Sequence, residues 1–146
     1  MASTDRPELA PATSRVRRGA LLVAGDMLAF HAVTAIGLLS HGELTGLDGL
    51  PHLAEVAMPF AAGWFLAAPF VGAFRSDVIA LPRRMLVRTI VAWLIACPIG
   101  LLFWSLVRQR PIQPAFAVVT FLTNLVVLLG WRGMFAFLAG REGFAE

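Results

Sequence analysis

The stretch that decides the fold runs from Gly19 to Glu43 and reads GALLVAGDMLAFHAVTAIGLLSHGE. It is long enough to cross a bilayer, because a hydrocarbon core of about 30 Å requires about 20 helical residues. It also contains Asp26 and His31, two ionisable residues that are costly inside a membrane. The sequence therefore predicts a membrane-spanning helix with a polar site inside it.

The composition of the whole chain indicates the same class of protein. Of the 146 residues, 58% are hydrophobic and 14% are charged, and the mean hydropathy is +0.77, which is too apolar for a soluble domain of this size. All twelve basic residues are Arg, and an abundance of Ala, Gly and Leu without Lys or Tyr is typical of a GC-rich bacterial genome. The single cysteine, Cys97, excludes a disulfide or a cysteine-based metal cluster within one chain.

Four apolar runs predict an all-α fold, a polytopic four-transmembrane-helix bundle. The runs lie near residues 19–40, 55–74, 88–107 and 113–132. They lack the alternation of barrel strands, and helices satisfy their own backbone hydrogen bonds inside lipid. We therefore expect a membrane domain over residues 19–133.

Both ends of the chain are predicted to lie outside this domain. Residues 1–18 are rich in Pro, Ser, Thr and Ala and lack an apolar period, which predicts a disordered cytoplasmic tail. Residues 134–146 are expected to form a cytoplasmic C-terminal tail. Its apolar residues Phe135, Phe137 and Leu138 either continue the last helix or lie at the membrane interface.

The distribution of arginine predicts the orientation of the helices. Ten arginines belong to the N-terminal tail, to the loop between the second and third runs, and to the C-terminal end, whereas only Arg108 and Arg110 belong to the opposite side. Cytoplasmic loops carry the excess of basic residues, so we expect a multi-pass plasma-membrane protein with both termini in the cytoplasm. The ten are Arg6, Arg15, Arg17, Arg18, Arg75, Arg83, Arg84, Arg88, Arg132 and Arg141. This arrangement explains the net charge of +3 without nucleic-acid binding.

Two prolines are predicted to kink the second and third helices. Pro69 follows Trp64 in GWFLAAPFVG, and Pro98 follows Trp93 in AWLIACPIG, with the same spacing in both. A proline inside a helix frees a carbonyl group and bends the axis. The pair is interpreted either as two coincident kinks, which we favour, or as an inverted repeat around a midplane cavity, as in transporters.

These segments resemble a known family. The motifs are AGD in the first run, GWFLAAPFVGAFR in the second, TIVAWLIACPIGLL in the third, and PAFAVV with LLGWRG in the fourth. Together they are similar to a family of small four-helix integral membrane proteins of bacteria and haloarchaea, catalogued only as a domain of unknown function. The resemblance covers roughly residues 19–133 and implies a fold and a membrane location, with no catalytic residue.

Polar residues of the first and last runs are predicted to form an intramembrane cluster. On a helix with about 100° per residue, the polar and small residues of the first run share one arc, which should face the bundle interior. Counting about 1.5 Å per residue places Asp26 at the depth of Asn124. The same count places His31 opposite Thr120, which predicts a ladder of hydrogen bonds between the two helices. The expected cluster comprises Asp26, His31, Thr34, Thr120, Thr123 and Asn124.

Three roles are open for this cluster. Polar contacts between membrane helices commonly fix helix register, and this interpretation is favoured. An ionisable residue in a membrane is also a functional hypothesis by default, so a proton or ion relay through Asp26 and His31 is the second interpretation. The third is His31 as an axial ligand of a tetrapyrrole pigment.

Two further segments carry weaker signals. The outer loop holds residues of the types that bind divalent metals, His41, Glu43, His52 and Glu55. An unstructured acidic loop is the favoured interpretation, and no metal site is predicted. The segment PRRMLVR, residues 82–88, suits contact with anionic lipid head groups, as cytoplasmic loops generally do.

No motif of an enzyme is found in the sequence, which lacks a nucleophile elbow, an HExxH pair and a phosphate-binding glycine loop. We therefore expect a non-enzymatic protein without cofactor or nucleic-acid partner. The leading hypothesis is an interaction or accessory subunit that contacts the lipid bilayer and either a second copy of itself or a larger membrane complex. The alternative is a small proton-coupled transporter or ion relay that uses Asp26 and His31.

Overall fold

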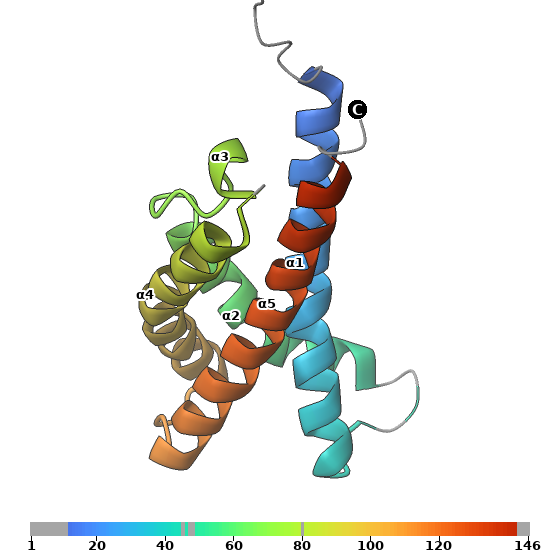
Figure 1. Cartoon of the computed structure of the whole chain (residues 1–146). Coiled ribbons are helices and arrows are strands. Elements are labelled where there is room, and N and C mark those ends of the chain that lie inside the picture. The colour runs from blue at the N-terminus through green and yellow to red at the C-terminus, as the bar shows by residue number, and fades with distance from the viewer. Residues whose placement is uncertain (1–11, 45, 47–48, 80, 143–146) are drawn as a thin grey trace, which may run out of the picture.

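The computed structural model describes residues 12–44, 46, 49–79 and 81–142. Within this part of the chain the secondary structure consists of helices and contains no strand (Figure 1), which confirms the all-α prediction. The helices are α1 (Ala12–Ser40), α2 (Leu50–Ala67), α3 (Ser76–Ile79), α4 (Pro82–Arg108) and α5 (Pro114–Glu142).

Three of these helices are long and apolar enough to cross a membrane. The stretches that meet this standard are Val16–Ser40, Pro82–Arg108 and Pro114–Arg141, which belong to α1, α4 and α5. They indicate a membrane protein. The predicted fourth span is not confirmed, because α2 is not among these helices. It has 18 residues, and the polar residues His52 and Glu55 together with Pro51 lower the hydropathy of its first turns.

The second helix ends earlier than predicted. The apolar run 55–74 was expected to be helical throughout, but α2 stops at Ala67 and a turn follows through residue 74. Ala68, the residue before Pro69, still has helical dihedral angles (φ −60°, ψ −37°). Pro69 itself lacks the N–H group that would continue the helical hydrogen bonds, and Gly72 takes a φ of 69°, which favours glycine. The predicted kink at Pro69 is therefore wrong, since this residue lies outside the helix. Pro98 does lie inside α4, and α2 contains Pro59.

The first and last helices extend further than predicted. α1 begins at Ala12, so the last part of the expected tail 1–18 is helical, while residues 1–11 lie outside the described residues. α5 continues to Glu142, so most of the expected tail 134–146 belongs to the last helix. Arg132 consequently lies well inside α5 rather than at its end.

The interior is built around the contact between α2 and α4. A Cβ atom added to Gly63 of α2 would lie 2.6 Å from the carbonyl oxygen of Ala96, and one added to Gly100 of α4 would lie 3.0 Å from the Cα of Phe60. The two backbones therefore approach closely because both positions are glycine. Next to this contact, the ring centroids of Trp64 and Trp93 are 6.4 Å apart, and both side chains are buried.

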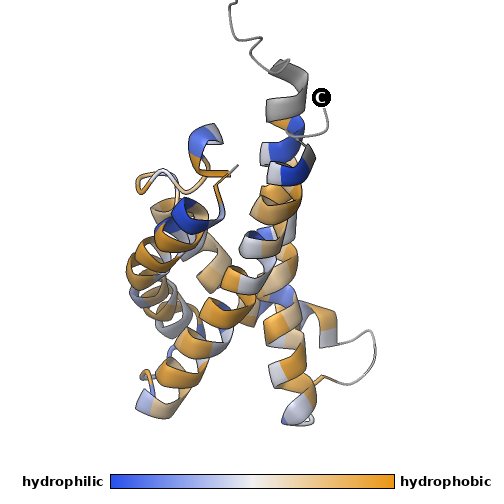
Figure 2. Cartoon of the chain, viewed as in Figure 1, coloured by the Kyte–Doolittle hydropathy of each residue, from blue (hydrophilic) through white to orange (hydrophobic). Residues whose placement is uncertain are grey.

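The two ends of the bundle differ in charge. Figure 1 shows the start of α1, the end of α5 and the short helix α3 at one end, with the end of α1 and the α4–α5 connection at the other. Hydrophilic residues gather toward these ends, and the helices between them are mostly hydrophobic (Figure 2). We call the end with α3 the arginine-rich end, because the described segments there contain Arg15, Arg17, Arg18, Arg75, Arg83, Arg84, Arg88 and Arg141.

Candidate functional site

An ion pair lies in the interior between the first and last helices. Asp26 of α1 and Arg132 of α5 are both completely buried. Arg132 donates from Nε to Oδ1 of Asp26 at 2.9 Å and from Nη2 to Oδ2 at 2.5 Å. This is the bidentate geometry in which arginine binds a carboxylate most strongly.

The remaining contacts of the pair come from α2, α4 and the turn after α2. Trp64 donates from its indole nitrogen to Oδ2 of Asp26 at 3.0 Å. Nη1 of Arg132 donates to the carbonyl oxygen of Ala73 at 3.1 Å and lies 3.6 Å from the sulfur of Met85. Both carboxylate oxygens and all three guanidinium nitrogens therefore have partners. We call these five residues the Asp26–Arg132 centre.

Aromatic rings enclose the guanidinium group. Its central carbon lies 4.7 Å from the centroid of the Trp64 ring and 4.8 Å from that of Phe74. A desolvated arginine gains cation–π attraction from such rings. Trp64 thus contacts both charged groups, because its N–H group donates to the carboxylate of Asp26 and its ring faces the guanidinium group of Arg132.

Local sequence explains how Arg132 reaches Asp26. Helical side chains lean toward the N-terminus of their helix, so the long side chain of Arg132 extends from its turn of α5 back along the helix, away from the arginine-rich end. Its burial shows that it lies on the face of α5 that packs against the other helices. Gly25 precedes Asp26, and a Cβ atom at this position would overlap the ring of Trp131. The glycine therefore allows α5 to approach α1 closely at the residue next to Arg132.

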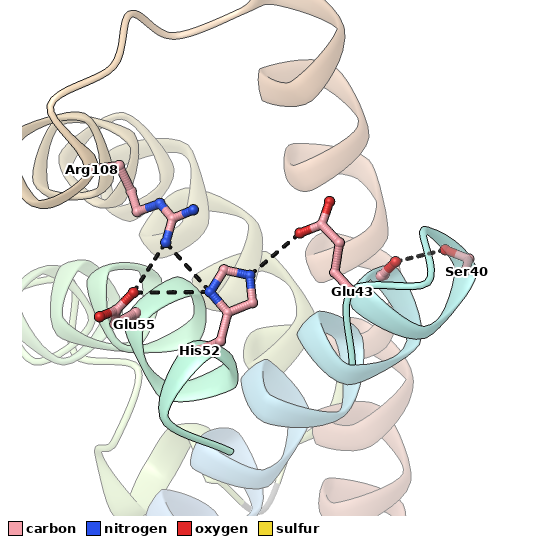
Figure 3. A network of polar contacts seen from close by, with 6 residues as sticks. Ser40, Glu43, His52, Glu55 and Arg108 are labelled. Carbon is pink, nitrogen blue, oxygen red and sulfur yellow. Dashed lines mark hydrogen bonds and ion pairs between the residues drawn. The ribbon is translucent and has the colours of Figure 1, made fainter. Parts of the chain in front are cut away.

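A second group of charged residues lies at the opposite end of the molecule (Figure 3). Nε2 of His52 lies 3.3 Å from Oε2 of Glu43. Arg108 donates from Nη1 to Oε2 of Glu55 at 3.0 Å and lies 3.4 Å from Nδ1 of His52. These four residues, which we call the His52 network, join the segment after α1, the start of α2 and the end of α4. The carboxylates of Glu43 and Glu55 remain more than half exposed.

The His52 network contains three of the four residues considered for a metal, but its geometry favours ion pairing. Arg108 places a positive charge beside Glu55 and His52, which opposes the binding of a cation. His41 is exposed and is not one of the network's residues. Among the described residues, no group of three or more His, Cys, Asp or Glu side chains is arranged to hold a metal ion.

A family model for a protein of unknown function, DUF3054, matches residues 23–135. The chain belongs to this family. The match confirms the family resemblance, and it includes Asp26, Trp64 and Arg132. Comparisons with curated proteins and with solved structures give no match.

Within the DUF3054 segment, the partner predicted for Asp26 is wrong. Asn124 is buried at the expected face of α5, but its amide donates to the carbonyl oxygen of Thr120 in its own helix at 2.9 Å. Thr123 is exposed and donates to the carbonyl oxygen of Val119 at 2.7 Å. Both side chains therefore donate to carbonyl oxygens one turn back in their own helix, as short polar side chains in helices often do.

The second rung of the predicted ladder is also wrong. Nδ1 of His31 lies 2.8 Å from the carbonyl oxygen of Met27, one turn back in α1. His31 and Thr34 are half-buried, whereas Thr120 is buried. The six expected residues therefore do not form one connected cluster, and Asp26 belongs to a different set of partners.

Arg132 and Trp64 are the two site residues that the sequence interpretation missed. Arg132 was counted among the arginines that flank the membrane, because the apolar run was ended at this position. The sequence did hold a signal: GMFAFLAG follows directly after Arg132, so apolar residues continue beyond it. An arginine inside such a run needs a buried partner, and Asp26 is the acidic residue inside the first run.

Proposed function

We propose that this protein is a non-enzymatic integral membrane protein that acts as an interaction or accessory subunit, through self-association or within a larger membrane complex. The Asp26–Arg132 centre carries this proposal. Its buried charges bind one another and hold four helices in register, so they serve the architecture. Because these interior charges are used for packing, we expect the protein to act through the outer surfaces of its helices.

The outer face of α5 supports an interaction role. α5 is the least enclosed of the three candidate spans, with 17% of its apolar window buried against 28% for α1 and α4. Gly130 lies on its exposed side, and a Cβ atom there would meet nothing within 4 Å. Within this chain Gly130 therefore serves no close contact, whereas small residues on membrane helices allow a partner helix to approach.

The alternative function, a proton or ion relay, has less support from the geometry. A relay needs neighbouring groups that exchange a proton. The carboxylate of Asp26 accepts three hydrogen bonds from Arg132 and Trp64, and His31 pairs with its own helix backbone. These contacts do not connect Asp26 with His31.

We further propose that α2 is a fourth, shorter span and that the arginine-rich end faces the cytoplasm of a bacterial cell. The burial of Arg132 removes it from the count of flanking arginines and leaves nine against two, which is still a strong bias. An even number of spans places both termini on the arginine-rich side, and this agrees with the positions of the helix ends in Figure 1.

Thiol labelling tests this orientation. Single cysteines replace the exposed residues Ser76 and Gln113 in a Cys97→Ala background, and an impermeant thiol reagent is applied to intact cells. Only Gln113→Cys should be labelled. Labelling of Ser76→Cys alone would reverse the orientation, and labelling of only one of Arg17→Cys and Arg141→Cys would contradict an even number of spans.

The interaction role is tested by measuring the mass of the protein purified in a mild detergent. We expect an assembly larger than the 15.8 kDa chain. Gly130→Leu should reduce the assembled fraction, because the added side chain keeps a partner helix away. Val118→Leu, another exposed change on α5, is the control and should not reduce it. A monomer for the unmodified protein, or equal effects of the two variants, would contradict the proposal.

A further inference from the structure

A pocket of about 430 Å³ lies at the arginine-rich end, between α3 and the first two turns of α4. Its lining residues are Asp77, Val78, Arg83, Arg84, Val87 and Arg88. We propose that this pocket binds the phosphate head group of an anionic phospholipid. The inference rests on the membrane placement given above, and goes beyond it by assigning a ligand class to a defined site.

The charge of the pocket favours an anion. Three arginines line it against one carboxylate, that of Asp77. Asp77 is already engaged, because it accepts a hydrogen bond from Arg75 at 3.2 Å and lies 3.9 Å from Arg84. The hydrogen bond from Arg75 lowers the pKa of Asp77, so the acid stays ionised and paired. The excess positive charge therefore remains for a ligand.

One wall of the pocket is fixed by the fold. Arg88 donates from Nη1 to the carbonyl oxygen of Val71 at 2.7 Å, which anchors α4 to the turn after α2. Arg83 and Arg84 stand one turn earlier and are exposed. Arg88 therefore helps to hold this wall of the pocket in place. Arg83 and Arg84 are exposed, and the described contact of Arg84 is its ion pair with Asp77, so replacing both should leave the interior of the bundle intact.

The start of α4 adds to the positive potential. Its N-cap residue, Leu81, offers no side-chain hydrogen bond to the first turn, and Pro82 occupies the first helical position. Uncapped amide groups and the helix dipole attract phosphate groups at such an end. This effect reinforces the arginines in the same place.

An apolar strip distinguishes a lipid from free phosphate. Val87 lines the pocket, and Val91 and Leu94 follow it along α4 at helical spacing. The three side chains are 53%, 38% and 55% exposed. The charged pocket thus continues into an exposed apolar face of a candidate span, which matches a phosphate head group with an acyl chain attached. A free phosphate would contact only the arginines of the pocket and not the apolar strip.

Lipid titration of the purified full-length protein, read by native mass spectrometry, tests the proposal. Phosphatidylglycerol should bind more tightly than phosphatidylcholine. Inorganic phosphate should bind more weakly than phosphatidylglycerol, because it lacks the acyl chains that contact the apolar strip. The double variant Arg83→Gln and Arg84→Gln should weaken phosphatidylglycerol binding about 10- to 30-fold. The matched control is Arg17→Gln with Arg141→Gln, which removes the same charge from the same end outside the pocket.

A second variant guards against loss of folding as the explanation. Asp77→Asn removes the one carboxylate of the pocket, so it should tighten phosphatidylglycerol binding, an effect that unfolding does not produce. Equal weakening by the two double variants, equal affinity for the two lipids, or inorganic phosphate that binds as tightly as phosphatidylglycerol would each overturn the proposal. These outcomes are independent of the oligomeric mass that tests the interaction role.

Discussion

The Asp26–Arg132 centre and the His52 network both join several helices through charged side chains, but they lie in opposite environments. In the first, the carboxylate and the guanidinium group are completely buried and every charged atom has a partner. In the second, the carboxylates of Glu43 and Glu55 are more than half exposed. The same kind of contact therefore has different energetic consequences at the two places.

Water accounts for the difference. Exposed ion pairs are screened by solvent and contribute about 0–1 kcal/mol. A buried pair contributes little more than an apolar pair when it is intact, but the loss of one partner leaves an unbalanced charge and costs about 3–5 kcal/mol. We therefore expect the buried centre to determine whether the protein folds, and the exposed network to adjust its stability only slightly.

The largest effect is expected for Asp26→Asn. The amide keeps the shape of the carboxylate but leaves Arg132 buried without its counter-charge, so the free energy of unfolding should fall by about 3–5 kcal/mol. Denaturant unfolding in detergent, followed by circular dichroism, measures this change. A fall of less than about 1 kcal/mol in the free energy of unfolding would show that the buried pair contributes no more than an exposed one.

The double variant Asp26→Leu with Arg132→Met is the control for this experiment. It removes both charges together and should recover most of the stability, because an apolar pair can replace a buried ion pair. Recovery should be incomplete, since Trp64 loses the acceptor of its indole N–H group. If the double variant were less stable than Asp26→Leu alone and Arg132→Met alone, pairing between the two residues would be contradicted.

Trp64→Phe sharpens the comparison by removing one donor and keeping most of the ring. A hydrogen bond to a charged group contributes about 1.5–3 kcal/mol, so we expect a loss of that size in the same unfolding measurement. Trp93→Phe is the matched control, because Trp93 is equally buried but donates to a backbone carbonyl, that of Phe121, at 2.9 Å. Its loss should be nearer 1 kcal/mol. Equal losses would indicate that the charge of Asp26 adds nothing.

Arg108→Gln tests the exposed network. We expect a loss below about 1 kcal/mol that disappears in high salt, because solvent ions screen exposed charges. Unfolding is compared at low and high ionic strength. A loss above about 2 kcal/mol that persists in salt would place the His52 network in the same class as the buried centre and remove the contrast between them.

The smallest effect is expected for Asp77→Asn, which removes another exposed pair. The pKa of Asp77 lies below the ordinary value of 3.8, chiefly because Arg75 donates a hydrogen bond to it. Its contribution is therefore fully present above that value and is lost as the pH falls through the lowered pKa. Unfolding midpoints of the unmodified and Asp77→Asn proteins should differ by a constant amount above about pH 5 and converge in stronger acid. Divergence on acidification would give the opposite sign and contradict the assignment.

Much of this fold could be predicted because apolar runs report helices directly. The helical arc through Asp26 pointed this residue inward, and its side chain is buried, while Leu28 and Ile36 on the other side are 70% and 67% exposed. The partner of Asp26 was missed for two physical reasons. Asn124 satisfied itself within its own helix, and the length of the Arg132 side chain broke the assumption that partners share the same depth.

The end of α2 shows a different limit of the sequence. Pro69 and Pro98 occupy similar patterns, yet Pro98 lies inside α4 while Pro69 follows the end of α2. Membrane helices tolerate proline when neighbouring groups satisfy the freed carbonyl. Whether neighbours do so depends on tertiary packing, which a local pattern does not contain. The turn after α2 then supplies the carbonyl of Ala73 to Arg132, so the missed helix end and the missed partner are connected.

The pairing of Asp26 with Arg132 also has a consequence for biosynthesis. The two residues are 106 positions apart, so at about 5–20 residues per second the carboxylate is made roughly 5–20 s before its counter-charge. During that interval α1 holds an acid that the later helices have not yet neutralised. A chain interrupted before Arg132 would therefore keep that acid without its counter-charge.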